Sequence, residues 1–177
     1  VQGTGSLPVV GTNITSGNDS TDALTYTTAS VRLVKGRLYL MSVVNTAASA
    51  GAISSIDSGP TFTSRSSTQF NTNAHRTSIW SAVPVTDYVG TLIINFGAST
   101  QTGCAWVLDE FANVDTASTD GIVQQQVGTG SSTTPTVTLA AFASTKNATY
   151  AAHGNGIDTT TTPAANFVEL ADVSAAT

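Results

Sequence analysis

Charged residues are scarce in this chain of 177 residues. Lys and Arg number 6 and Asp and Glu 11, so only 10% of residues are charged and the formal net charge is -5. An ordinary soluble domain carries roughly 25% charged residues. Six cations make a poor footprint on phosphates, which excludes a nucleic-acid binder that works by phosphate neutralisation. Hydrophobic residues at 40% exclude disorder over the whole chain.

Cysteine and long apolar runs are also missing. Cys104 is the single cysteine, so no disulfide can form within these residues. A lone cysteine in an apolar run is most often a buried small side chain, and we expect this of Cys104. No stretch approaches the roughly 18 apolar residues of a membrane span, so we expect no membrane partner. Because the chain begins at Val1 and not at Met, we expect a processed start or part of a longer polypeptide.

Strong helix formers are few, whereas Ser and Thr make up more than a quarter of the chain. No window shows the period of an amphipathic helix. Threonine is β-branched, so it favours extended backbone and suits the solvent face of a sheet. Turn signals recur about every 8 to 12 residues, which is typical of an antiparallel sandwich or barrel. The sequence therefore predicts an all-β fold.

About nine segments have the composition of strands. They are residues 26–33, 37–45, 61–63, 75–84, 91–96, 104–111, 122–127, 136–142 and 147–153, with a further apolar cluster at Phe167, Val168 and Leu170. We predict an antiparallel β-sandwich of about nine strands, jelly-roll-like, over residues 25–177. Residues 1–24 are predicted to form an N-terminal arm and loop, with residues 1–12 as an arm or a short edge strand and residues 13–24 as a polar loop, and residues 64–74 are predicted to form a loop.

The predicted sheet edges have few charged guards. Soluble sheets protect their edges with lysines and inward-pointing charges, which this sequence hardly offers. We therefore expect the chain to dock against other subunits, as a homo-oligomer.

Nothing in the sequence assembles a nucleophilic active site. The histidines are His75 and His153, and no GxSxG motif occurs. We expect no enzyme activity and assign no catalytic, cofactor-binding or metal-binding residue.

Adjacent carboxylates occur at Asp109 and Glu110. Neighbouring residues of a strand point to opposite faces, so these two cannot form a glycosidase pair with each other. We expect Glu110 to be exposed and Asp109 to accept hydrogen bonds near a strand end. An acid pair built from one of these two with a distant partner such as Asp87 or Asp57 is the alternative.

Calcium is the metal that the composition favours most, because it binds clustered loop oxygens. Asn18, Asp19 and Asp22 lie in one predicted loop, and Asp115 and Asp120 in another. Neither loop matches an EF-hand, and such residues are common in turns for their own hydrogen bonds. The turn interpretation is preferred, and calcium remains the alternative.

Aromatic rings are the usual platform for sugars. The candidates are Trp80, Trp106, Tyr39 and Tyr88. Both tryptophans lie in apolar strands, where we expect core or interface packing. Tyr88 lies in a predicted turn and is the better candidate for exposure, although one ring is not a site.

Several strand segments together resemble a β-sandwich domain of virion proteins in tailed bacteriophages, found in head-decoration and in tail or fibre proteins. They are residues 36–40, 76–84, 90–96, 103–115 and 136–142, within a resemblance that spans about residues 25–155. The resemblance implies a structural or adhesive role on a particle, with no catalytic residues.

These expectations combine into one hypothesis with an alternative. The hypothesis is a non-enzymatic structural subunit at the surface of a phage particle, a capsid decoration or virion surface protein. Its partners are other virion subunits, without nucleic acid or cofactor. The alternative is a carbohydrate-binding or host-adhesion module with the same fold.

Overall fold

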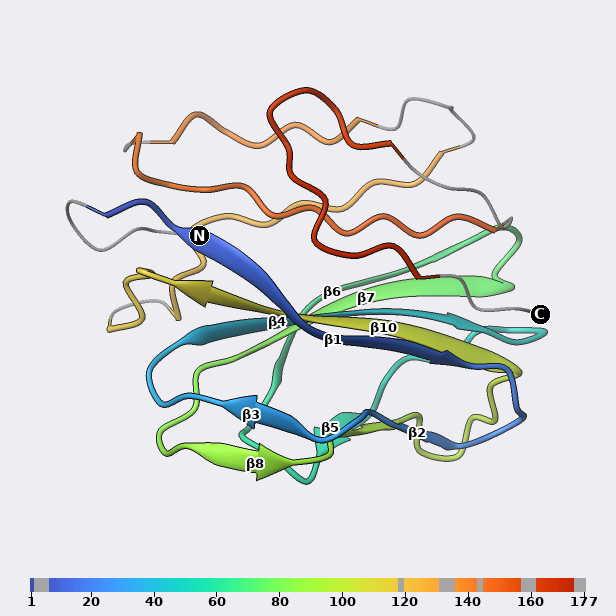
Figure 1. Ribbon diagram of the computed structural model, residues 1–177. Coiled ribbons are helices and arrows are strands. Elements are labelled where there is room, and N and C mark those ends of the chain that lie inside the picture. Colours follow the sequence, from blue (N-terminus) through green and yellow to red (C-terminus); the bar gives the residue numbers. More distant parts are fainter. Residues whose placement is uncertain (2–6, 118–119, 131–135, 143–144, 157–161, 174–177) are drawn as a thin grey trace.

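The computed structural model describes residues 1, 7–117, 120–130, 136–142, 145–156 and 162–173. These residues form an all-β, antiparallel β-sandwich with ten strands (Figure 1). They contain no helix, and hence none long and apolar enough to cross a membrane.

The larger sheet has five strands in the order β1-β10-β4-β7-β6, with every neighbouring pair antiparallel. Its strands are β1 (Val10–Asp19), β10 (Gly103–Ala112), β4 (Leu38–Thr46), β7 (His75–Ala82) and β6 (Thr63–Phe70). Strands β4 and β10 are buried along most of their length, because they occupy the middle of the sheet.

The opposite layer consists of two small sheets. One has the order β2-β9-β5, from β2 (Thr25–Thr27), β9 (Ile93–Asn95) and β5 (Ser55–Asp57). The other pairs β3 (Val31–Leu33) with β8 (Tyr88–Gly90). The jelly-roll arrangement stays a prediction, because this layer is divided and does not form one continuous sheet.

The main hydrophobic core lies between these two layers. Alternate residues of β10 point into it, so that Cys104, Trp106 and Leu108 share one buried cluster. Tyr39 and Met41 of β4 are fully buried in the same cluster. The period of two residues that a strand imposes therefore places the apolar residues of each central strand on the inner face.

The predicted strands over residues 37–45, 75–84, 91–96 and 104–111 are confirmed as β4, β7, β9 and β10. The single strand predicted over residues 26–33 is divided into β2 and β3, which pair in different sheets.

Two predictions of irregular structure are wrong. Residues 13–19, predicted as polar loop, belong to edge strand β1, which begins at Val10 within the stretch predicted as an arm or a short edge strand, and most of the loop predicted over residues 64–74 belongs to edge strand β6. Both strands are rich in Ser, Thr, Asn or Gly and lack a strong alternation of apolar residues. An edge strand needs less apolar surface than a central strand, so its sequence resembles that of a loop.

The described residues after Ala112 form no strand, so the strands predicted over residues 122–127, 136–142 and 147–153 are wrong, as is the one at Phe167, Val168 and Leu170. The described residues among 122–173, called the C-terminal segment below, instead cover the outer face of the five-stranded sheet as a third layer, orange to red in Figure 1. A strand must pair with an edge, whereas this segment lies over a face.

Candidate assembly surface

The outer face of the five-stranded sheet carries a second apolar cluster. Leu38, Leu40 and Phe111 point away from the main core and are buried. Ile122, Tyr150 and Leu170 of the C-terminal segment pack against them or their neighbours in this cluster. The C-terminal segment therefore removes from water a sheet face that would otherwise be exposed.

A polar cluster lies beside these apolar contacts and is centred on Asp109 of β10, which is 1% exposed. Its Oδ1 accepts a hydrogen bond of 3.0 Å from Asn13 Nδ2 of β1. Its Oδ2 accepts one of 3.0 Å from the hydroxyl of Tyr150. The same hydroxyl lies 2.7 Å from Ser42 Oγ of β4. The Asp109 carboxylate thus connects β10 to β1 and to the C-terminal segment, and the Tyr150 hydroxyl connects that segment to β4.

Burial changes the acidity of both partners. Loss of water raises the pKa of Asp109, although the hydrogen bonds from Asn13 and Tyr150 act in the opposite direction. Burial and the neighbouring Asp109 carboxylate raise the pKa of Tyr150. The tyrosine therefore stays protonated at neutral pH and donates to the carboxylate.

The backbone of the C-terminal segment approaches the sheet closely at a glycine. A Cβ atom on Gly154 would overlap the hydroxyl of Thr77 and lie 2.9 Å from Val44 Cγ2. The burial of residues 149–154 alternates between exposed and half-buried, as in an extended chain lying on a surface. Among the described residues, no backbone hydrogen bond joins this segment to the strands of the sheet.

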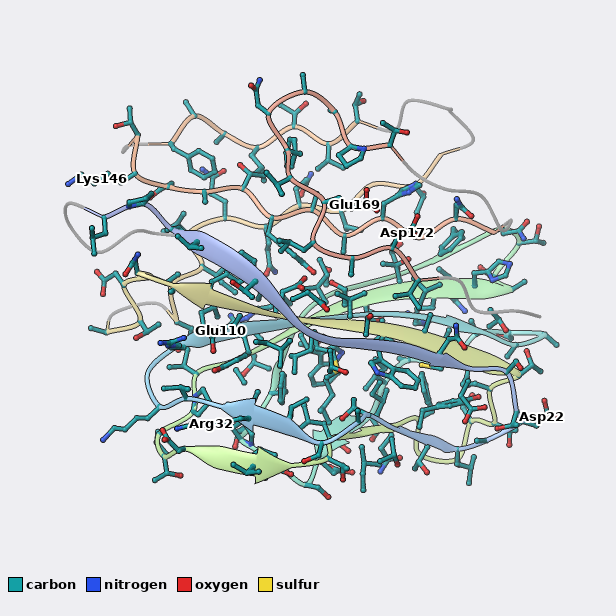
Figure 2. All side chains as sticks on the ribbon, in the orientation of Figure 1. Asp22, Arg32, Glu110, Lys146, Glu169 and Asp172 are labelled. Carbon is teal, nitrogen blue, oxygen red and sulfur yellow. The ribbon has the colours of Figure 1, made fainter. Side chains whose placement is uncertain are left out.

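The first part of the C-terminal segment, residues 122–156, is nearly uncharged. Lys146 is the only Lys, Arg, Asp or Glu of residues 122–156. Figure 2 shows Lys146 toward one end of this layer and Glu169 and Asp172 in the later part of the chain. Val127 and Val137 are 48% and 51% exposed. The described part of residues 122–156 therefore presents a nearly uncharged surface with exposed aliphatic side chains, called the neutral outer layer below, and the acidic side chains lie in the later part of the segment.

Both edges of the five-stranded sheet contain a bulge. The register shifts at Ile14 of β1 and at Arg65 of β6. Arg65 donates to Ser81 Oγ at 2.6 Å and forms an ion pair of 2.7 Å with Asp120. Bulges hinder pairing with another edge, so these edges have a protection that the composition does not reveal.

Asp109 and Glu110 point to opposite faces, as predicted, and Asp109 accepts hydrogen bonds, as predicted. The expectation that Glu110 is exposed is wrong, because it is 9% exposed. Its carboxylate accepts hydrogen bonds from the Arg37 guanidinium and the Tyr39 hydroxyl. The pKa of Tyr39 is raised to about 12. Burial is the largest cause, and the hydrogen bond to Glu110 is the second. Both carboxylates therefore have structural partners.

The structure does not bring the alternative acids to Asp109. Asp57 lies in β5 of the opposite layer, where it accepts a hydrogen bond of 3.0 Å from Asn95. Asp87 precedes β8 in that layer and accepts the Lys35 backbone N–H at 2.8 Å. Asp109 faces outward from the sandwich, so neither acid shares a cleft with it.

The two histidines lie in other surroundings than these acids. The His75 ring stacks on Phe70 with a centroid distance of 5.3 Å. His153 is exposed on the C-terminal segment.

The carboxylates considered for calcium take part in local contacts. Asp19 accepts hydrogen bonds from the backbone and the hydroxyl of Thr21, and Asp115 accepts from the Ala117 N–H. Asp120 pairs with Arg65. Within the described part of the chain, no three His, Cys, Asp or Glu side chains are grouped as metal ligands.

The aromatic candidates are mainly core residues. The expectation for Trp80 and Trp106 is confirmed, since they are 8% and 6% exposed. Tyr39 is fully buried. Tyr88 is half-buried against the main core, and its hydroxyl donates to the Thr91 carbonyl at 2.6 Å. These four rings provide no flat exposed platform.

A hollow of about 360 Å³ lies where the Trp80 ring meets the loop around β5. Residues 54–62 complete its lining, with several serines and Asp57. Its lining is mixed, with hydroxyls and one carboxylate beside the apolar side chains of Ile56, Phe62 and Trp80.

Cys104 is fully buried in the main core, which confirms the expectation drawn from its apolar neighbours. Burial raises the pKa of its thiol, so it remains protonated and unreactive in the folded chain.

Sequence reasoning missed the partners of Asp109. Asn13 was placed in a loop, and neither Ser42 nor Tyr150 was singled out. One signal was available: Asp109 alternates with apolar residues in a central strand, so a buried carboxylate needs donors from elsewhere in the chain.

Comparisons of the chain with protein-family models, curated proteins and solved structures give no match.

Proposed function

We propose that this chain is a non-enzymatic structural subunit of a tailed-phage particle, a capsid decoration or virion surface protein that docks on neighbouring subunits as a homo-oligomer. The proposal starts from the phage resemblance of the strand segments and is supported by the surface chemistry of the C-terminal segment.

The observation that carries the docking role is the neutral outer layer. Residues 122–156 have one charged side chain in a chain whose net charge is -5. Two acidic copies can approach through this layer with little repulsion. Its backbone is extended over residues 149–154 without a ladder, and long segments without secondary structure are uncommon in compact domains. A neighbouring subunit that docks on this layer would cover its backbone and its exposed aliphatic side chains.

The non-enzymatic role is supported by the use of the acidic side chains. Asp109 and Glu110 each accept a hydrogen bond from a tyrosine hydroxyl. Asp57 accepts one from the Asn95 side chain, and Asp87 accepts one from a backbone N–H. Each of these carboxylates has a structural task.

Mass spectrometry of purified source particles tests the location, and sedimentation of the isolated chain over a range of concentrations tests docking. We expect hundreds of copies per particle and a self-associating chain. Absence of the chain from particles would contradict the virion role. A stable monomer at high concentration would contradict docking on its own copies.

The glycan-binding alternative would use the hollow beside Trp80, because its serine-rich lining suits hydroxyl groups. A glycan array tests it, with Asp57→Ala as the variant and Asp87→Ala as the matched control. Binding that is lost only in Asp57→Ala would favour this alternative.

A further inference from the structure

We propose that the C-terminal segment is an exchange arm: in the assembled protein, Tyr150 of one copy docks on Asp109 and Ser42 of a neighbouring copy. The inference rests on the proposed docking function and names its partner, a second copy of this chain.

The first argument is the kind of contact that holds the arm. Tyr150 contacts the sheet through its hydroxyl and through its ring, which meets Phe111 edge-on with a centroid distance of 5.4 Å. Leu170 lies over Gly11, where a Cβ would be 3.1 Å from its Cδ1. A second copy offers the same sheet face with the same groups. Such an exchange preserves every contact and alters only the connection.

The second argument is the connection between β10 and the arm. Asn113, Asp120 and Gly121 have φ values of 61°, 52° and 74°, in the left-handed region. For Asn and Asp this conformation is less favourable than ordinary extended backbone. Two of the three, Asn113 and Asp120, are not glycine, so this backbone can relax when the connection opens, at the loss of the ion pair between Asp120 and Arg65.

The third argument is local concentration. On a particle, neighbouring copies stand within the reach of an extended arm, which spans about 3.3 Å per residue. The sheet face of such a neighbour is then present at a high effective concentration, and it competes with the arm's own sheet face for docking of the arm.

A mixed-chain crosslink tests the exchange. One chain carries Thr77→Cys and a second, tagged chain carries Gly154→Cys, the two positions that touch where the arm crosses the sheet. Neither chain can form this disulfide alone, so a bond between them requires an exchanged arm. We expect a mixed dimer after mild oxidation of the assembled mixture. A matched mixture of Thr77→Cys with Val85→Cys, which is 81% exposed, reports random collisions.

A second test leaves Gly154 unchanged, because a side chain there disfavours docking on native Thr77. Asp109→Ala and Tyr150→Phe each remove one partner of the central contact, and each removes it equally from a closed copy and from an exchanged copy. In an exchanged pair made of one copy of each variant, one of the two contacts regains both native side chains, and the oligomer fraction of the mixture measured by sedimentation should rise above that of either variant.

The outcomes separate the two proposals. Assembly without a mixed disulfide and without recovery in the mixture overturns the exchange arm and leaves the docking function standing. A native chain that does not assemble overturns both. A mixed disulfide above the collision control, together with recovery, establishes exchange between copies.

Discussion

Asp109 and Glu110 are neighbours in β10 that face opposite sides of the sheet, and each accepts a hydrogen bond from a tyrosine hydroxyl. Tyr150 reaches Asp109 from the C-terminal segment, whereas Tyr39 reaches Glu110 from the adjacent strand β4. One dipeptide thus connects the sheet both to its covering layer and to the inner core.

Asp109→Asn should weaken the pH dependence of stability above about pH 4, where an unfolded aspartate begins to lose its proton. Burial raises the pKa of Asp109 in the folded chain above the unfolded value of about 3.9. The folded state therefore binds the proton more tightly, and this contribution to stability is lost as pH rises through the raised pKa. Urea titrations should show the native chain losing stability relative to Asp109→Asn as pH rises. A difference that stays constant with pH would contradict the prediction.

Tyr150→Phe should lower the free energy of unfolding by about 1–3 kcal/mol at pH 7, because it leaves the buried Asp109 carboxylate with one donor fewer. The ring contact with Phe111 is retained. Tyr88→Phe is the matched control: its hydroxyl bonds at an exposed position, so we expect a loss below about 1 kcal/mol. Denaturant unfolding measures both, and an equal loss in the two variants would contradict the role of Tyr150.

The same substitution should expose the C-terminal segment to protease earlier than the sandwich. Few backbone hydrogen bonds hold this segment, so it should open locally before the whole chain unfolds. Limited proteolysis followed by mass spectrometry should give early cleavage after residue 121 in Tyr150→Phe and little change in Tyr88→Phe. Simultaneous cleavage throughout the chain would show that the segment and the sandwich open together.

Glu110→Ala should destabilise the chain more than Glu110→Gln does, by about 1–2 kcal/mol, because alanine removes the acceptor of the buried Tyr39 hydroxyl. Arg37→Ala should have a smaller effect than Glu110→Ala, since the Arg37 side chain is 46% exposed and water can replace part of its ion pair. Thermal and urea unfolding of the three variants check the order.

Cys104 should react with a thiol reagent only when the chain unfolds, because the side chain is fully buried and burial raises its pKa. Leu108→Ala, in the same core, should accelerate labelling, since such a cavity costs about 2–5 kcal/mol. Val89→Ala, at a position that is 71% exposed, is the control and should change little. Fast labelling of the native chain in buffer would contradict the buried position.

The central strands could be predicted because burial leaves a pattern in their sequence. In β10 the alternation of Trp106 and Leu108 with Asp109 predicts both the strand and its two faces. Edge strand β6 carries Ser and Thr on both faces, so its polar sequence predicts a loop although the segment forms a strand. The segment at 147–153 has the opposite property: its sequence is typical of a strand, but no sheet edge lies beside it.

The amino-acid sequence alone determined the all-β class, the burial of Cys104 and the opposite orientation of Asp109 and Glu110, because these follow from composition and from the two-residue period of a strand. Only the tertiary structure decided which strands pair, that Glu110 is covered, and that Tyr150 and Asn13 meet at Asp109. The contact between Asn13 and Asp109, for example, joins residues 96 positions apart in the chain. Local patterns do not encode such distances, because the partner of a buried polar group is chosen by the packing of whole layers.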